Sequence, residues 1–338
     1  ITESYNGVDA EGCTRFGRPI TLASSWNVDL VHKVWDCMGR EARLRGLHMT
    51  HSPEIDIVRD PRFGRMSEAF GEDTHLVTEM AVAAVSGIQG DSKGLFKTHI
   101  GAVSKHFAGY GLVAGGKNFA SVEISPRTLV DEIFPPFEAA VKRANTLGIM
   151  AAHNDLNGVA CHGSYELLTE VLRNQWGFKG YVVSDANDIA RLNFFMNVAE
   201  NAEEAAILGL SAGMDVDLYN DNCYALLPEL VKKKPELLQY IDRSALRVLR
   251  TKFILGLFEN PYIDENEAKN YIKNPANVGI ANEADAESFI LLKNTNNILP
   301  LSKNSGLKIG LLGPVLPQNS VAAFKEIAPS HTFSAQKG

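Results

Sequence analysis

The sequence predicts an α/β protein with the architecture of a (β/α)8 TIM-type barrel, irregular or incomplete in form. Helical stretches alternate with short apolar strands five times between residues 27 and 218, which is the pattern of a parallel sheet covered by helices. The predicted strands also end in polar residues that can bind or react. A (β/α) barrel assembles its active site at the carboxyl ends of its strands, so this second observation favours a barrel over a doubly wound sheet.

The first two units occupy residues 27–107. Apolar residues at helical spacing predict a helix over Asn27–Arg45, which Gly46 ends before the strand-like segment LHMTHSP. A second helix has its apolar face over residues 76–88 and ends at Gly90. The strand THIGAVSKHF follows it after a loop.

Three further units have the same form. A helical stretch begins at Pro126, where proline suits the first turn, and Pro135 and Pro136 are expected to break it before the strand IMAAHN. The next helix stops at Gly177 before GYVVSD, and the last stops at Gly213 before MDVDL. Only five or six strands can be counted, so the barrel is either irregular or lacks its first unit.

Each predicted strand ends in polar side chains, which we expect to converge on one site. They are His48 and His51, Lys105 and His106, His153 and Asn154, Asp185, and Asp215.

The chain is expected to contain three regions. Residues 1–258 would form the barrel domain, and residues 259–306, which are polar and rich in turn formers, would form a linker with a helix from about Ala281 to Leu292. The segment LKIGLLGPV predicts the first strand of a further α/β domain over residues 307–338, which has little chain left to complete it.

Composition excludes several classes of partner. The formal charge is −7 and the isoelectric point is about 5.8, with acidic and basic residues interspersed, so neither a nucleic-acid nor a membrane partner is expected. No apolar run approaches the roughly 18 residues of a membrane span. The four cysteines are far apart, which favours neither a zinc knuckle nor a disulfide framework. The start, ITESYNGVDA, lacks a signal-peptide pattern, so a leader has been removed or the chain begins partway into the protein.

Five segments, in order, resemble glycoside hydrolase family 3: YNGVDAEG, RDPRFGRMSEAFGED, KHFAGYG, GFKGYVVSD and AESFILLKNTNNILPLS. The resemblance implies a retaining β-glycosidase, most simply a β-glucosidase that releases a terminal non-reducing glucose through a covalent glycosyl-aspartate. It implies a nucleophile on the barrel and a general acid on a following sandwich domain. Asp185 matches the nucleophile. Family members are commonly secreted or periplasmic, and no cofactor or metal is implied.

The resemblance also implies a set of sugar-binding residues: Asp9, Arg65, Lys105, His106 and, in support, Glu68. A carboxylate accepts hydrogen bonds from sugar hydroxyls and a guanidinium donates them from a rigid fork. Asp9 would bind the side of the ring where a pentoside lacks its hydroxymethyl group, so a β-linked glucoside or oligosaccharide is expected ahead of a xyloside.

Structural roles compete with these assignments. Asp185 could simply cap the following helix, and Arg65, like its neighbours Arg59 and Arg62, could form a surface ion pair. Lys105 and His106 are adjacent on a strand, so they point to opposite faces unless a bulge or the strand end turns them.

Two positions depart from the family pattern. His153 stands where a tyrosine beside the nucleophile is usual, and it could either orient Asp185 or be a plain strand-end residue. Ala186 replaces the aromatic residue that tends to follow the nucleophile. The pocket is therefore expected to be more open, with weaker stacking on the sugar, and linkage preference stays undecided.

No residue is assigned as the general acid. Retaining hydrolysis needs a second carboxyl about 5 to 5.5 Å from the nucleophile, and no glutamate here lies in a matching segment. One family subgroup uses a histidine and aspartate pair in a barrel loop, but LVAGGKNFASVEIS contains no histidine. The acid is expected beyond the end of the chain.

Two other functions remain open. A metal-dependent barrel hydrolase would use the strand-end residues His48, His51, His106, His153 and Asp185 as ligands, although His48 and His51 face opposite sides of an extended segment. A fragment that binds sugar but lacks the general acid would turn over only activated substrates. The sequence predicts no oligomeric state.

Overall fold

The computed structural model describes residues 3–90, 98–218, 222–272, 274–302, 304–313 and 332–337. The chain divides into two compact units, Ile1–Phe289 and Ile290–Gly338, which are treated separately below. Among the described residues, no helix combines the length and the apolar character needed to cross a bilayer.

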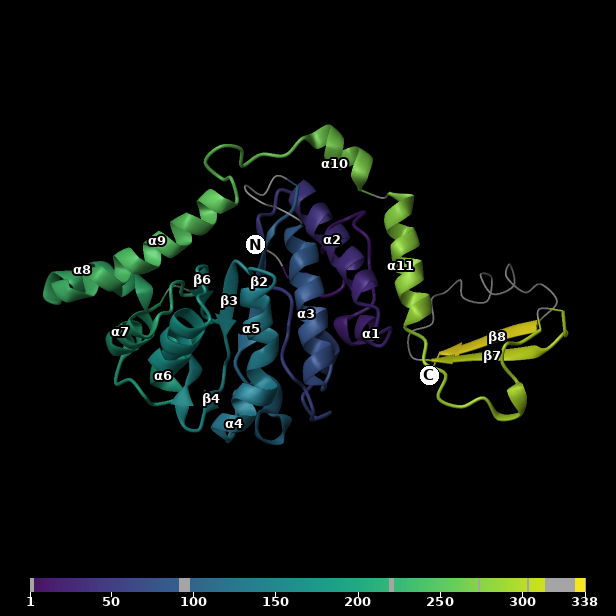
Figure 1. Cartoon of the computed structure of the whole chain (residues 1–338), viewed down its shortest axis with the longest axis horizontal. Coiled ribbons are helices and arrows are strands. Elements are labelled where there is room, and N and C mark those ends of the chain that lie inside the picture. The colour runs from purple at the N-terminus through teal and green to yellow at the C-terminus, as the bar shows by residue number, and fades with distance from the viewer. Residues whose placement is uncertain are drawn as a thin grey trace. The chain divides into compact units, whose positions relative to one another are not determined.

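A parallel sheet lies at the centre of the first unit (Figure 1). Its strands are β1 (Met49–Thr50), β2 (Gly101–Phe107), β3 (Gly148–Ala151) and β6 (Tyr181–Val183), in the spatial order β1-β2-β3-β6. Val216 adds a single bridge beyond β6, where the sequence predicted a full strand. The (β/α) barrel class is confirmed, and the described strands form an open barrel.

Helix α3 (Thr74–Gln89) packs against both α2 (Val28–Leu44) and α5 (Phe134–Lys142), and α3 and α5 pack against β2 (Figure 1). The predicted boundaries of α2 and the predicted end of α3 at Gly90 are confirmed. The side chain of Asn27 accepts a hydrogen bond from Leu30 N at the start of α2, and that of Asp73 accepts one from Leu76 N at the start of α3. These caps explain where the two helices begin.

The predicted break at Pro135 and Pro136 is wrong. The chain continues from α4 (Pro126–Thr128) through a π-type turn at Leu129–Ile133 into α5, which contains both prolines in its first turn. Backbone N–H groups of a first turn have no acceptor within their own helix, so proline costs little there. The widened turn restarts the helix in a register that accepts both prolines.

The remaining elements of the first unit surround this core. They are α1 (Pro19–Ala23), a hairpin of β4 (Asp155–Leu156) with β5 (Val159–Ala160), a π-type helix at Glu166–Gln175, α6 (Asp188–Phe194), α7 (Ala202–Ala212), α8 (Leu227–Lys233), α9 (Leu238–Ile254), α10 (Glu265–Tyr271) and α11 (Pro275–Glu287).

Helices α10 and α11 pack back onto α2. Arg40 forms an ion pair with Glu267 at 2.9 Å, and Asn277 donates to Glu41 at 3.1 Å. The helix predicted to reach Leu292 ends at Glu287. The division between the units, after Phe289, falls inside the linker proposed for residues 259–306.

The second unit contains a parallel pair, β7 (Lys308–Gly313) and β8 (Thr332–Lys337). The strand predicted from LKIGLLG is confirmed, and residues 314–331 of the further α/β domain proposed for residues 307–338 lie outside the described residues.

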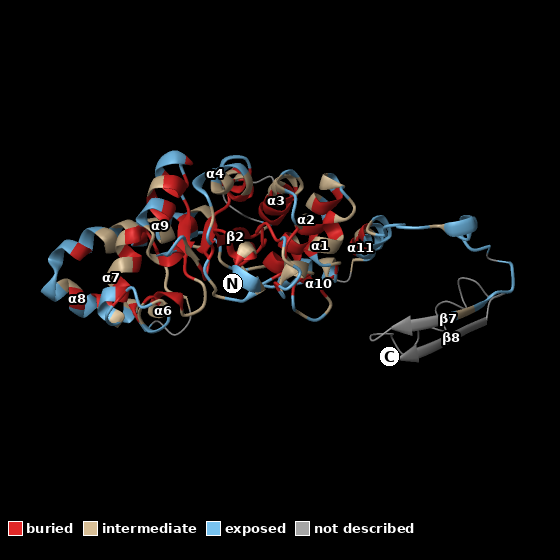
Figure 2. Cartoon of the chain, turned by 90° about the horizontal axis from the view of Figure 1, so that it is seen from below, coloured by how far each residue is buried: buried red, intermediate tan, exposed pale blue. Residues whose placement is uncertain are grey.

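Burial follows the sheet and the inward faces of its helices (Figure 2). All seven residues of β2 are buried. Several polar side chains are buried with them at the carboxyl ends of the strands, namely His51, Glu54, Asp56, Lys105, His106, His153, Asn154, His162 and Asp188. Burying so many ionisable groups is costly unless they are paired, which marks this end of the sheet as the candidate site.

Candidate active site

Asp185 lies just beyond the end of β6, where histidines from two neighbouring strands meet it. His153, just beyond β3, has its Nε2 2.9 Å from Asp185 Oδ2, and His106 in β2 has its Nε2 3.5 Å from the same oxygen. The Asp185 side chain keeps 14% of its surface exposed. The predicted convergence of these three residues is therefore confirmed, with the aspartate reachable from solvent.

The carboxylate of Asp185 is held in its ionised form. Burial favours the neutral acid, but the hydrogen bond from His153, the neighbouring His106 and the Ala186 N–H, which donates to Oδ1 at 2.6 Å, together hold the pKa of Asp185 well below its usual range. The N-cap of α6 is Asn187. The alternative role of Asp185 as a helix cap is thus wrong.

The second ring nitrogen of His153 contacts another carboxylate, that of Asp188. Its Nδ1 lies 2.5 Å from Asp188 Oδ2, and Asp188 accepts a further bond from Arg191 at 2.6 Å. Burial lowers the pKa of His153, but the hydrogen bonds and charges of Asp185 and Asp188 outweigh burial and raise that pKa to about 9. His153 is consequently an imidazolium near neutral pH, fixed between two carboxylates.

Lys105 and His106 both reach the site because the pairing register between β2 and β3 shifts between Ser104 and Phe107. This irregularity removes the strict alternation of faces that a regular strand imposes. His106 Nδ1 lies 2.9 Å from Asp56 Oδ2, which also accepts the His106 backbone N–H at 3.0 Å. Burial lowers the pKa of the His106 imidazole.

Arg65 joins the cluster as predicted. Its Nη2 lies 3.0 Å from Glu54 Oε2 and 2.8 Å from Glu68 Oε2, and it donates to the Tyr5 hydroxyl at 3.3 Å. Burial raises the pKa of Glu54, whereas the pKa of Glu68 is lowered because hydrogen bonds and the charge of Arg65 outweigh its partial burial.

The neighbours of Arg65 behave differently. Arg59 pairs with Glu132 and Arg62 pairs with Asp60, and all four side chains are partly or largely exposed. Of the three arginines in RDPRFGR, Arg65 therefore has the contacts expected of a ligand-binding group.

Glu3 and Tyr5, which the sequence reasoning missed, complete the polar cluster through Lys105. Lys105 Nζ lies 3.0 Å from Glu3 Oε1 and donates to the Tyr5 hydroxyl at 2.6 Å. The Lys105 side chain is 2% exposed, whereas that of Glu3 is 55% exposed. A charged lysine beside glutamate and tyrosine oxygens is a ready donor to sugar hydroxyls. Tyr5 opens the motif YNGVDAEG, and Glu3 stands two residues before it.

Asp9 is not brought to this cluster. Its side chain is 86% exposed and pairs with Arg15 at 2.5 Å. The Val8 carbonyl accepts from Ala10 N, so Asp9 occupies a tight turn on the surface. The hexose preference inferred from Asp9 loses its structural basis.

The metal ligand set considered from the sequence is not assembled. His106, His153 and Asp185 lie together, but His48 Nε2 contacts the Pro261 carbonyl at 3.1 Å instead of joining them. Within the described residues, metal-like spacing occurs at Glu54, Asp56 and His106, whose ligand atoms lie within 4.8 Å of one another.

That triplet is a poor site for a divalent ion. Arg65 already donates to Glu54, and the positive charges of Arg65 and Lys105 act on both carboxyls of the triplet. Two cations beside the site would repel a further one.

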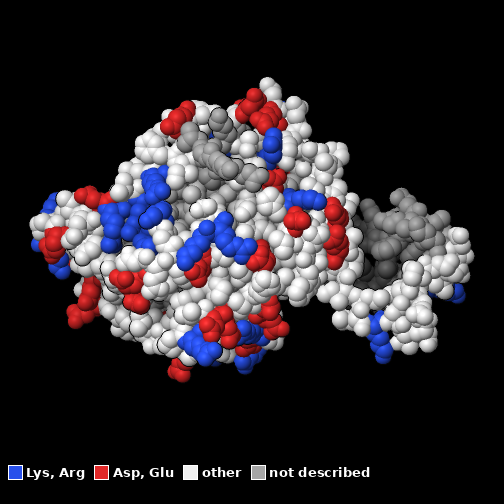
Figure 3. Space-filling model, viewed as in Figure 1, with Lys and Arg blue, Asp and Glu red and all other residues white. Residues whose placement is uncertain are grey.

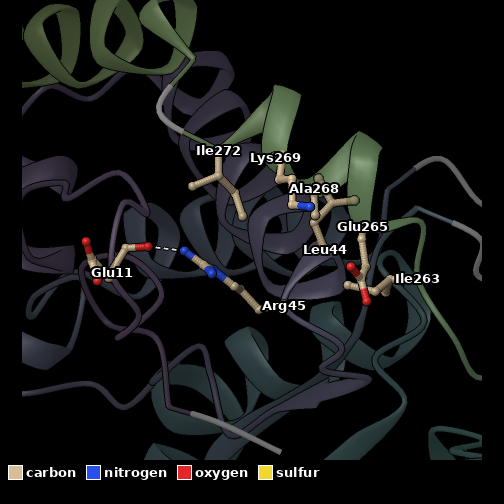
Figure 4. Close-up of a pocket in the computed structure, with 8 residues that line it drawn as sticks. All are labelled: Glu11, Leu44, Arg45, Ile263, Glu265, Ala268, Lys269 and Ile272. Carbon is tan, nitrogen blue, oxygen red and sulfur yellow. Dashed lines mark hydrogen bonds between the residues drawn. The ribbon is translucent and has the colours of Figure 1, made fainter.

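A separate hollow of about 550 Å³ lies between the end of α2 and α10 (Figure 4). Its lining residues are Glu11, Leu44, Arg45, Ile263, Glu265, Ala268, Lys269 and Ile272. Arg45 spans it and donates to the Glu11 carbonyl. None of these residues belongs to the cluster around Asp185, so the hollow is not part of the candidate site.

Charges of both signs are spread over the face of the molecule drawn in Figure 3. Figure 3 shows acidic and basic residues interspersed over one face, with a basic group where α9 lies at the left. No broad basic face is visible in this view, in agreement with the net charge of −7.

Comparison with known proteins points to one family. The model of the glycosyl hydrolase family 3 N-terminal domain matches residues 3–251. The chain is 66% identical over its whole length to a Formosa agariphila protein named "Putative beta-xylosidase", of which it covers 45%. It is 37% identical to a periplasmic beta-glucosidase of Salmonella typhimurium, over 89% of this chain and 40% of that protein. The chain spans less than half the length of either relative.

The chain is also similar in fold to solved structures that carry the name β-glucosidase. A β-glucosidase from Erythrobacter marinus superposes with a TM-score of 0.94 at 37% identity, over 99% of this chain and 47% of that one. A β-glucosidase from Listeria innocua in complex with glucose gives a TM-score of 0.91 at 29% identity, over 99% and 48% of the two chains.

Proposed function

This chain belongs to glycosyl hydrolase family 3, and on that premise we propose that it carries the nucleophile of a retaining β-glycosidase, with Asp185 in that role. The observation that carries the proposal is the ionised Asp185 carboxylate, held at the carboxyl end of β6 by His153 and His106 and partly open to solvent. In a retaining enzyme such a carboxylate attacks the anomeric carbon and forms a glycosyl ester, which water then hydrolyses.

His153 contributes to both steps. Before attack it fixes the direction of the carboxylate, because Asp188 holds its other nitrogen. In the second step the C–O bond of the ester breaks and the Asp185 carboxylate leaves, and the imidazolium stabilises the charge that returns to it. A carboxylate of low pKa is a weaker nucleophile but a better leaving group. The low pKa of Asp185 therefore slows formation of the glycosyl ester and speeds its hydrolysis.

The polar cluster would bind the sugar transferred to Asp185. Lys105 and Arg65 offer donors while Glu3 offers acceptors, and Lys105 and Glu3 lie within 3.0 Å of each other. Alternating donors and acceptors suit neighbouring hydroxyls of a pyranose, each of which donates one hydrogen bond and accepts others. Glu68, paired with Arg65, orients that guanidinium.

We propose a substrate with a terminal β-xylosyl unit as the first candidate and one with a terminal β-glucosyl unit as the second. The relative that is 66% identical carries a β-xylosidase name, and the contact expected to favour a hexose, Asp9, lies away from the cluster. The β-glucosidase structures of similar fold, one of them with glucose, keep the glucoside as the second candidate.

The general acid is assigned to no described residue. The carboxyls around the histidines beside Asp185 are already engaged: Asp56 with His106, Glu54 with Arg65, and Asp188 with His153 and Arg191. All three carboxyls are buried. We propose that another part of the protein supplies the acid, and that the protein acts in the periplasm, as the name of the Salmonella relative says of that protein.

The test uses the purified protein and its Asp185→Asn variant on nitrophenyl β-xyloside, nitrophenyl β-glucoside and the matching unactivated disaccharides. A nitrophenolate needs little protonation, so the aryl substrates report on the nucleophile and the disaccharides on the acid as well. We expect hydrolysis of the aryl xyloside at a higher kcat/KM than the glucoside, and a loss of at least about 1,000-fold in the variant. Equal activity of the variant would remove Asp185 from the mechanism.

A further inference from the structure

An aromatic pair lies next to the candidate nucleophile. Phe119 comes from the loop that follows β2, and Phe195 directly follows α6. The Phe119 ring centroid is 4.3 Å from that of His153 and 5.8 Å from that of Phe195. Because His153 contacts Asp185 at 2.9 Å, aromatic surface begins one side chain away from the carboxylate.

The position of Phe119 is strongly determined. Its φ of 67° lies in the left-handed region that a phenylalanine rarely adopts. The Arg191 guanidinium lies 4.5 Å from the ring centroid and donates to the Ala186 carbonyl and to Asp188, each at 2.6 Å. Through Arg191, the Phe119 ring is therefore tied to the segment that carries the nucleophile.

The pair leaves apolar surface in contact with solvent. Phe195 is 50% exposed, and Phe119 is half-buried. The residue after the nucleophile is Ala186, whose methyl group cannot form a wall. Phe119 thus supplies, from a different loop, the aromatic surface that the sequence led us to expect to be missing.

Polar and apolar groups both border the two histidines beside Asp185. His106 Nδ1 contacts Asp56, and the Tyr110 ring lies against both histidines while its hydroxyl accepts from Arg65. The Phe119 ring lies against His153 and Phe195. A transferred sugar needs many hydrogen bonds, which the polar groups offer. The two phenylalanine rings offer flat apolar surface, which suits the C–H face of a pyranose or an aryl ring.

We propose that Phe119 and Phe195 form the leaving-group subsite and stack on the ring attached through the glycosidic oxygen. This rests on the proposed glycosidase function and deepens it. The subsite selects substrates whose leaving group is a ring, either a second β-linked sugar or an aryl aglycone, over those with a small branched alkyl group.

The test compares two β-glycosides whose leaving groups have similar acidity, phenyl and hexafluoroisopropyl, together with the β-linked disaccharide. The sugar is xylose, or glucose if the wild type cleaves that series faster. The variants are Phe119→Leu and Phe195→Leu, with Phe119→Tyr to retain the ring. Phe258→Leu is the matched control, because Phe258 is 55% exposed and pairs with Phe253 at the end of α9.

We expect both leucine variants to lower kcat/KM about fivefold or more on the phenyl glycoside and the disaccharide, and less than about twofold on the fluoroalkyl glycoside, as loss of an aromatic contact predicts. Phe119→Tyr and Phe258→Leu should match the wild type. Equal losses on all substrates would make Phe119 a support for His153 and overturn the subsite, as would no loss on any. A wild type inactive on every glycoside would defeat the proposed function and the subsite with it.

Discussion

Asp185 and Asp188 are joined by one imidazole. His153 Nε2 lies 2.9 Å from Asp185, and its Nδ1 lies 2.5 Å from Asp188. Two carboxylates sharing one imidazolium keep the ring charged and fix its orientation. The pair thereby sets both the charge state and the direction of the candidate nucleophile.

Replacing His153 with glutamine should remove the charge while leaving a hydrogen-bond donor near Asp185. We expect kcat/KM on an aryl glycoside to fall about 10- to 100-fold, the range for loss of a hydrogen bond to a charged group. The pKa of Asp185 should rise, because the hydrogen bond from His153 helps to lower it. Steady-state kinetics measure the first effect, and the acid limb of the pH profile measures the second. A change of less than about twofold in kcat/KM would show that the ring has only a structural role.

Activity should fall on the alkaline side as His153 loses its proton. The pKa of His153 in the folded protein, about 9, is above its ordinary value of 6.5. The ion pairs therefore stabilise the fold fully below pH 6.5, and this stability is lost as the pH rises through 9. An aryl substrate with a good leaving group isolates this limb from that of the general acid.

Asp188→Asn is the partner experiment to that pH profile. It removes one of the two charges that raise the pKa of His153, so the alkaline limb of kcat/KM should move to lower pH. Asp188 is buried and contacts the far nitrogen of His153, so KM should change little. An alkaline limb that stays in place in the Asn variant would mean that another group titrates there.

Substitutions of Glu3 and Asp9 are expected to have different effects on activity. Glu3 contacts Lys105 in the polar cluster, whereas Asp9 pairs with Arg15 on the surface. Glu3→Gln should lower kcat/KM about tenfold or more, mainly through KM, because a charged acceptor for sugar hydroxyls is lost. Asp9→Asn should stay within about twofold of the wild type. The opposite ranking would restore the assignment made from the sequence.

Substituting Gly87 tests the close packing of α2 against α3, and substituting Gly279 provides the control. A Cβ on Gly87 would lie 2.6 Å from the His32 carbonyl oxygen, whereas one on Gly279 in α11 would meet nothing within 4 Å. Gly87→Ala should destabilise the protein by about 1–3 kcal/mol through overpacking. Gly279→Ala should stabilise it by up to about 1 kcal/mol, because alanine favours a helix interior. Urea unfolding measures both, and two equal effects would contradict the close contact.

The fold class was predictable because local patterns specify it. Helices α2 and α3 begin at their capping residues Asn27 and Asp73, and the apolar strands precede polar ends as a barrel requires. Barrel closure was not predictable, since it depends on pairing between distant strands. The segment MDVDL makes one bridge at Val216 and no strand, although its pattern is that of a strand.

The site was predicted in part, for a similar reason. Lys105, His106 and His153 were found because they stand at strand ends, and Arg65 because it stands in the motif RDPRFGR. Glu3 and Phe119 come from loops, where no periodicity announces a contact, and the position of Phe119 depends on an unusual backbone angle.

Trapping the covalent intermediate tests the central claim most directly. A 2-deoxy-2-fluoro β-glycoside with an activated leaving group slows both steps, and hydrolysis of the ester most, so a retaining enzyme accumulates the glycosyl ester. After proteolysis, mass spectrometry should locate one fluorosugar on the peptide that contains Asp185, and the Asp185→Asn variant should remain unlabelled. A fluorosugar attached to any other residue, or equal labelling of the variant, would contradict the assignment of Asp185 as the nucleophile.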